Sequence, residues 1–254
     1  MTETLSLRAK IEQSPMGAYQ WMIVVMAAIM NLLDGFDVLA LAFTATAIRG
    51  EFGLTGIELG YLLSAGLFGM TAGSLFLAPL ADKIGRRPLL LMAVSLSAIG
   101  MLGSAFISQY QWLGFWRVIT GLGVGGILVG TNVITSEYSS RKWRSFAISV
   151  YAAGFGIGAV LGGMFAVMLQ GEYGWRSVFL AGAILTGLLL VILFIWLPES
   201  IDFLTSKQPK NAEVRLNLIA KKIGLAGDWK LPEKAEKVKT KLPISQLFSE
   251  KYLH

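Results

Sequence analysis

The chain has 254 residues, of which 54% are hydrophobic and 15% charged, and its formal net charge is +6. This composition is too apolar for a water-soluble domain of this length, so it predicts an all-α, polytopic membrane protein. Cysteine is absent and the single histidine is His254, so disulfides and clustered metal ligands are excluded and no cofactor is expected.

Six apolar runs have about 20 residues or more each, which is enough to cross about 30 Å of hydrocarbon. They lie approximately at 19–48, 59–81, 88–107, 112–136, 146–169 and 178–198. The first run lacks a small-residue cleavage site, so we expect a retained span and not a signal peptide. The predicted parts are an N-terminal segment (1–18), a six-helix transmembrane bundle (19–200) and a polar segment (201–254).

The first run contains two aspartates, Asp34 and Asp37. A charged group at bilayer depth costs at least about 2.5–3.5 kcal/mol, and such groups are kept when they face a cavity and handle protons or a substrate. The alternative is a pair of buried carboxylates that only bond a neighbouring helix. Asn31, one turn earlier, is predicted to bond either an aspartate or a substrate.

The loop between the second and third runs contains Asp82, Arg86 and Arg87. Gly85 permits a turn with positive φ, and Asp82 can form a charge-assisted cluster with the arginines. An Arg-rich inner loop could also act only as a determinant of topology.

Basic residues are distributed unevenly between the loops. If the N-terminus is cytoplasmic, the outer loops keep only Arg49 and Arg176, and all eleven Lys and Arg residues after the sixth run lie inside. This positive-inside pattern predicts that both termini are cytoplasmic. The positive charge is therefore attributed to topology, and nucleic acid is not expected as a partner.

The fourth run is rich in glycine. Gly121, Gly123 and Gly126 match the GxGxxG dinucleotide fingerprint, but no strand precedes them. We expect these residues to serve close helix packing instead.

Residues 78–88 closely resemble the helix 2–3 signature of the major facilitator superfamily, with Ala78 in place of the first glycine. The segments 137–144 and 197–200, and the Arg117–Gly121 spacing, resemble further elements of that superfamily. The resemblance implies the N-terminal bundle of a twelve-helix transporter, built as a 3+3 inverted repeat. It also implies a cytoplasmic charge network for conformational gating, formed from Asp82, Arg86, Arg87, Glu137 and Arg144.

Within that superfamily, Asp34-Gly35-Phe36-Asp37 resembles the D-G-x-D element of the aromatic acid/proton symporters. This resemblance implies symport of a benzoate-like carboxylate with protons across the inner membrane, and both aspartates would be needed for uptake. Phe36, Phe43 and Trp116 are weaker candidates for stacking on a substrate ring.

Arg117 is predicted to lie about 8 Å below the outer end of its helix, and Asp37 is the nearer aspartate in depth. We expect that Asp34 or Asp37 carries a coupled proton. Arg117 would alternate between pairing with a carboxylate and anchoring the substrate, because a guanidinium can hold a carboxylate bidentately. The alternative is a static ion pair.

The expected second six-helix half is not part of this sequence. We therefore expect either the N-terminal half of a proton-coupled symporter or a stand-alone or truncated six-helix membrane protein without transport activity. An enzyme is not expected, because no nucleophile–base pair, metal cluster or phosphate loop is found.

Overall fold

The computed structural model describes residues 6–225 and 227–231. Within these ranges the protein consists of helices and turns without a strand, as the all-α prediction requires. The nine helices of the described residues are α1 (Leu7–Gln13), α2 (Ala18–Phe52), α3 (Gly56–Ile84), α4 (Arg86–Ala105), α5 (Tyr110–Tyr138), α6 (Arg144–Tyr173), α7 (Arg176–Trp196), α8 (Ile201–Lys207) and α9 (Ala212–Lys222). The helices α2 to α7 are long and apolar enough to cross a membrane, so the prediction of six spans is confirmed.

The helix ends follow from local chemistry. Gly53 ends α2 in the left-handed conformation with φ 63°, where a residue without a Cβ is unstrained. Thr55 then starts α3, because its hydroxyl accepts from the backbone N–H of Glu58 while the Glu58 carboxylate accepts from the backbone N–H of Thr55. This hairpin explains why α2 extends a few residues beyond the predicted run.

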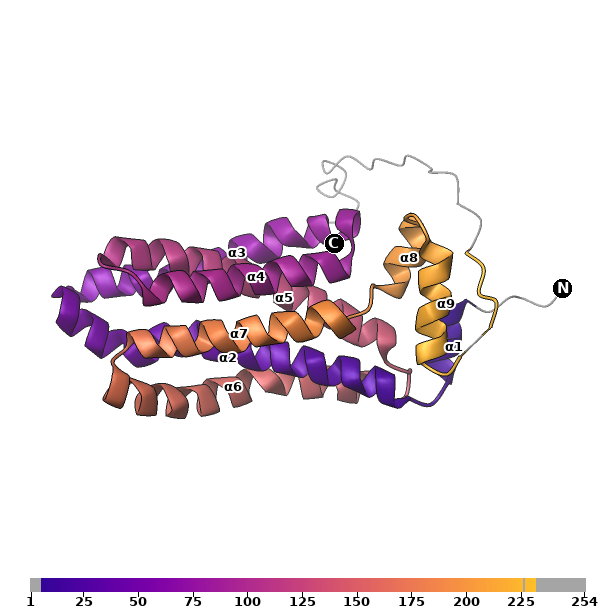
Figure 1. Ribbon diagram of the computed structural model, residues 1–254, viewed down its shortest axis with the longest axis horizontal. Helices are drawn as coiled ribbons and strands as arrows, with labels where there is room; N and C mark the ends of the chain where they lie inside the picture. Colours follow the sequence, from indigo (N-terminus) through magenta and orange to yellow (C-terminus); the bar gives the residue numbers. More distant parts are fainter. Residues whose placement is uncertain (1–5, 226, 232–254) are drawn as a thin grey trace, which may run out of the picture.

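The six long helices run lengthwise beside one another (Figure 1). The closest pairings are α2 with α6, α3 with α5, and α4 with α5 and α7. Glycine makes these approaches possible: a Cβ on Gly35 or Gly158 would collide with the backbone of the facing helix in the α2–α6 pair. The glycines of α5 that match GxGxxG likewise meet the backbone of α3 or α4 or the side chains packed there, so the prediction of close packing is confirmed.

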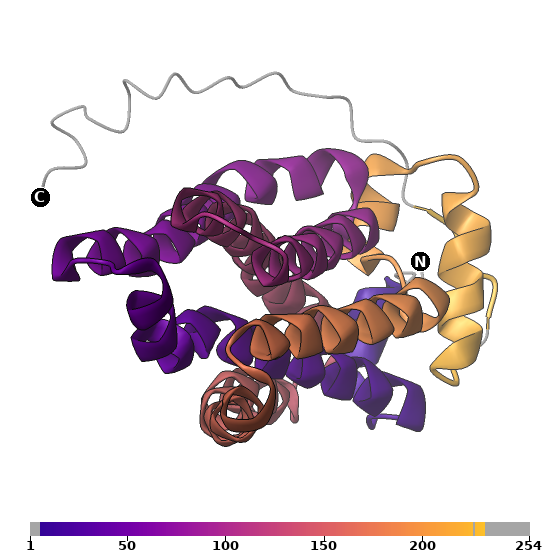
Figure 2. The same cartoon turned by 60° about the vertical axis from the view of Figure 1, so that its left-hand side comes forward.

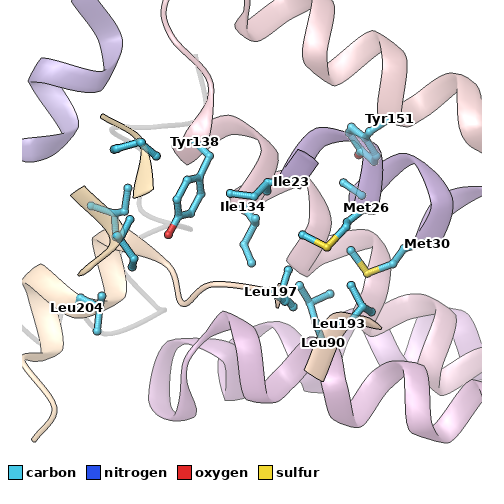
Figure 3. Packing of buried hydrophobic residues seen from close by; sticks show 14 of the residues in the cluster. Ile23, Met26, Met30, Leu90, Ile134, Tyr138, Tyr151, Leu193, Leu197 and Leu204 are labelled. Carbon is cyan, nitrogen blue, oxygen red and sulfur yellow. The ribbon is translucent and has the colours of Figure 1, made fainter. Parts of the chain in front are cut away.

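Three short helices, α1, α8 and α9, gather at one end of the bundle (Figures 1 and 2). A continuous apolar cluster joins them to the membrane helices, and Figure 3 shows Tyr138, Leu197 and Leu204 within it. Leu7 and Ile11 of α1 belong to the same cluster. The sequence did not predict α1, which lies within the N-terminal segment 1–18. The part of the polar segment after residue 231 lies outside the described residues.

Candidate functional site

Two aspartates and one arginine lie buried in the middle of the bundle. Asp34 and Asp37 come from α2 and Arg117 from α5, and each is at most 3% exposed. Asp37 Oδ2 accepts a hydrogen bond of 2.6 Å from Ser97 Oγ of α4, whereas Asp37 Oδ1 has no partner among the described residues. We call these three charged residues the midplane cluster.

The Arg117 side chain is directed toward α4 more than toward the aspartates. Its Nη2 donates to Ser104 Oγ at 2.9 Å and to Thr120 Oγ1 at 3.0 Å. The guanidinium also lies 4.9 Å from the centre of the Phe179 ring. The Arg117 guanidinium is therefore held by neutral groups, two hydroxyls and an aromatic ring.

The expected ion pair between Arg117 and Asp37 does not form within the described part of this structure. Arg117 Nη1 instead reaches the backbone oxygen of Asp37 at 3.5 Å, and Arg117 Nε is buried without a partner. Arg117 Nη2 does not pair with the Asp37 carboxylate because it donates to the Ser104 hydroxyl and the Gly100 backbone oxygen of α4 instead. The two residues are brought together without being paired.

Asp34 and Asn31 lie one and two turns deeper along α2. Asp34 Oδ2 is buried and unpartnered. Asn31 Nδ2 donates to the backbone oxygen of Tyr151 at 2.9 Å, so its donor group fastens α2 to α6 and does not bond an aspartate. The Asn31 side-chain carbonyl oxygen has no partner among the described residues, so only this atom is available to bond an aspartate or a substrate as predicted.

A small cavity of about 30 Å³ opens beside Asp37 and Arg117. Thr120, Gly121 and Gly66 contribute to its wall, and leucine and valine side chains supply the remainder. It has room for water but is too small for an aromatic ring.

The aromatic candidates do not line this cavity. Phe36 and Phe43 pack against glycines of α6, and Trp116 packs against Gly103 of α4. In this conformation these rings fill space between helices.

The residues predicted for gating lie at the end of the bundle where α1, α8 and α9 gather. Asp82 and Arg86 form an ion pair of 2.7 Å. Arg144 pairs with Glu12 of α1 at 2.6 Å, and it does not join the other members of the predicted network. Arg87 Nη2 donates to the backbone oxygen of Phe194 at 2.7 Å.

Glu137 caps the start of α8. Its carboxylate accepts from Ser200 Oγ at 2.8 Å and from the backbone N–H groups of Ile201 at 2.8 Å and Asp202 at 3.4 Å. The structure therefore separates the predicted network into an Asp82–Arg86 pair, an Arg144–Glu12 pair and a Glu137 cap.

Two carboxylates at this end were missed from the sequence as site residues. Glu199 Oε1 accepts from the backbone N–H groups of Arg86, Arg87 and Ser200, so it caps the start of α4. Its position in the Leu197–Ser200 element was the available signal. The hydrogen bond from Arg144 lowers the pKa of Glu12 from its usual value; no local signal identified Glu12, because its partner lies 132 residues away.

The family model described as Major Facilitator Superfamily matches residues 27–253 of this chain. The chain belongs to the major facilitator superfamily. The predicted family is thereby confirmed, and the match includes all six spans almost completely.

Among curated superfamily relatives, a gallate transporter of Pseudomonas putida is 34% identical over 242 residues, which are 95% of this chain and 54% of the relative. The 4-hydroxybenzoate transporter PcaK of Pseudomonas putida is 34% identical over 234 residues, covering 91% of this chain and 52% of the relative. The chain thus spans about half the length of these relatives.

A solved structure of the proton:xylose symporter XylE, bound to 6-bromo-6-deoxy-D-glucose, superimposes with a TM-score of 0.72 at 22% identity. The match covers 83% of this chain and 50% of XylE. This likeness supports the superfamily fold of the six-helix bundle.

Proposed function

We propose that this chain forms part of a secondary active transporter that carries aromatic carboxylates together with protons by alternating access. The observation that carries the proposal is the midplane cluster, in a superfamily member whose relatives include transporters named for gallate and 4-hydroxybenzoate. Asp34 and Asp37 each keep a buried oxygen without a partner, and a carboxylate in that environment is suited to binding and releasing a proton.

Arg117 is proposed to anchor the substrate carboxylate. Its Nε has no partner and its Nη1 makes only a 3.5 Å contact, so two N–H directions remain for bidentate binding. The apolar side chains around the cavity suit an aromatic ring, whereas Asp37 and Arg117 supply its polar wall.

A second six-helix bundle is proposed as the partner that completes the substrate site. The cavity is too small for the proposed substrate in this conformation, and only 17% of the apolar window of α3 and 22% of that of α6 are buried. Substrate sites in this kind of transporter lie at the interface of two repeated halves near the midplane.

The proposed location is the inner membrane, with the α1, α8 and α9 end in the cytoplasm. The basic loops and the described basic residues after α7 lie at that end, as the positive-inside rule requires. Asp82, Arg86, Arg87, Glu137 and Arg144 would then act from the cytoplasmic side on the change between outward-facing and inward-facing states.

The proposal is tested by uptake of radiolabelled 4-hydroxybenzoate and gallate into cells that lack their own aromatic acid uptake. One set of cells expresses the native gene, and another expresses residues 1–254 alone. Accumulation that collapses with a protonophore is expected for the native gene. Accumulation that persists with the protonophore would contradict proton coupling. If no substrate accumulated, the result would favour a six-helix membrane protein without transport activity.

A further inference from the structure

A second site lies at the cytoplasmic end of the bundle, away from the midplane cluster. It is a groove of about 250 Å³ between the end of α7 and the short helix α9. Figure 1 shows α9 at the end of the bundle where α7 ends. The groove residues that matter here are Tyr19, Arg87, Trp196, Arg215, Leu218 and Lys222.

The groove is positively charged. Arg87, Arg215 and Lys222 line it together with one carboxylate, Glu199. Glu199 Oε1 is already occupied by three backbone N–H groups. Arg215 and Lys222 form no ion pair within the described residues, and the Lys222 ammonium lies 5.3 Å from the Tyr19 ring centre. Their charge is therefore available to an external anion.

Arg87 fixes the depth of the groove relative to the bilayer. Its guanidinium donates to the backbone oxygen of Phe194 and lies 5.9 Å from the Phe194 ring centre, close to the last turn of the membrane helix α7. Trp196, the final residue of α7, is 52% exposed. A tryptophan and an arginine at the end of a membrane helix are typical of the headgroup level of a membrane.

The helix α9 has an apolar face that the protein does not cover. Leu216 is 1% exposed and belongs to the core, whereas Val214 and Leu218 are 60% and 56% exposed. Leu218 lies three and four residues from Arg215 and Lys222, so it shares their helical face. A face that combines apolar and basic side chains is typical of a helix at the membrane surface.

We propose that this groove binds the headgroup of an anionic phospholipid from the cytoplasmic leaflet. Arg215 and Lys222, with Arg87, hold the phosphate, and Trp196 and Leu218 contact the glycerol and the start of the acyl chains. A lipid is favoured over a soluble phosphate because the wall continues into the exposed apolar surface of α7. The proposal rests on the topology given above, but not on the transport activity.

The test is native mass spectrometry of the 254-residue chain in detergent, titrated with phosphatidylglycerol or with phosphatidylcholine of identical acyl chains. The wild-type chain is expected to retain phosphatidylglycerol in preference to phosphatidylcholine. The double variant R215Q/K222Q is expected to bind it about 30-fold more weakly, because each basic residue near an anionic headgroup contributes about fivefold.

The matched control is K207Q/K210Q, which removes the same charge from exposed positions outside the groove. This control is expected to bind phosphatidylglycerol as the wild type does. An equal loss in both double variants would overturn the proposal, since binding would then depend on net charge alone.

Two measurements on the wild-type chain need no variant. Equal retention of both lipids would show that the groove does not select an anionic headgroup. Displacement of phosphatidylglycerol by an equal concentration of glycerol phosphate would assign the site to a soluble anion. Either result would sink the lipid proposal even if the double variant did not fold.

Discussion

The midplane cluster and the end of the bundle where α1, α8 and α9 gather both bury carboxylates, but the two sets of carboxylates differ in their hydrogen bonds. At the α1, α8 and α9 end, Glu137 and Glu199 accept hydrogen bonds from hydroxyl and backbone N–H groups that start helices. In the midplane cluster, Asp34 and Asp37 each leave a buried oxygen unpartnered. A saturated carboxylate stabilises the fold, whereas an unsaturated one destabilises it and is available to a proton or a ligand.

The same contrast applies to the arginines. Arg144 and Arg86 each pair with a carboxylate at the α1, α8 and α9 end, at 2.6 and 2.7 Å. Arg117 is held by neutral oxygens and an aromatic ring, so its charge is stabilised without being neutralised. An arginine in that state can exchange partners at little cost, which suits a substrate anchor.

The largest expected effect is on transport, from Asp37→Asn. Uptake should fall to background because asparagine cannot carry a proton. The thermal midpoint should not fall, because the amide oxygen can still accept from Ser97 and a buried carboxylate is removed. Proton-driven uptake and thermal unfolding in detergent measure the two effects.

The matched control for that variant is Asp228→Asn, a change at an exposed position. It should leave uptake unchanged. Undiminished accumulation by Asp37→Asn would show that this carboxylate does not take part in proton coupling. The two regions would then differ only in how their carboxylates pack.

A large structural effect is expected from Gly158→Ala. A Cβ at Gly158 would collide with the backbone carbonyl of Leu32 and force α2, which carries both aspartates, away from α6. The expected cost is about 1–3 kcal/mol of stability, seen as a lower thermal midpoint. Gly156→Ala, on the same helix with open space around it, is the control and should not be destabilised. Equal midpoints for both variants would show that close α2–α6 packing does not position the midplane cluster.

Glu137→Gln should lower stability by about 1–3 kcal/mol, because glutamine has one acceptor oxygen where Glu137 uses two, so either the Ser200 hydroxyl or the N–H groups that start α8 lose their acceptor. The measurement is the thermal midpoint, compared with Glu172→Gln at an exposed position of α6. If Glu137→Gln instead matched or exceeded the wild type in stability, Glu137 would belong with the destabilising carboxylates of the midplane.

The smallest effect is expected from Glu12→Gln, about 0.2–1 kcal/mol, because the pair with Arg144 is partly exposed. The Arg144 hydrogen bond depresses the pKa of Glu12, so its stabilisation is present above the usual glutamate range and is lost as the pH falls through the depressed value. The midpoint difference between wild type and variant should be present at neutral pH and disappear in acid. A midpoint difference that grew in acid would show that the ionised Glu12 carboxylate does not stabilise the protein. The control is Glu213→Gln, at an exposed position of α9.

The number and approximate bounds of the membrane helices, and the position of Asp34 and Asp37 within one of them, could be predicted from the sequence alone. Both follow from the thickness of the bilayer, which fixes how many apolar residues a span needs wherever the remaining helices lie. The superfamily was also accessible, because the 78–88 loop is a contiguous pattern.

Which polar groups meet depends on the tertiary structure. Asp37 and Ser97 are 60 residues apart, Glu12 and Arg144 are 132 apart, and each bond depends on how several helices pack. The sequence suggested an Asp37–Arg117 ion pair from depth alone, but in the structure the guanidinium donates to Ser104 of α4 and to Thr120 of its own helix. Depth in the membrane is a local property of one helix, whereas partner choice depends on the relative rotation of several, and no single run of residues encodes it.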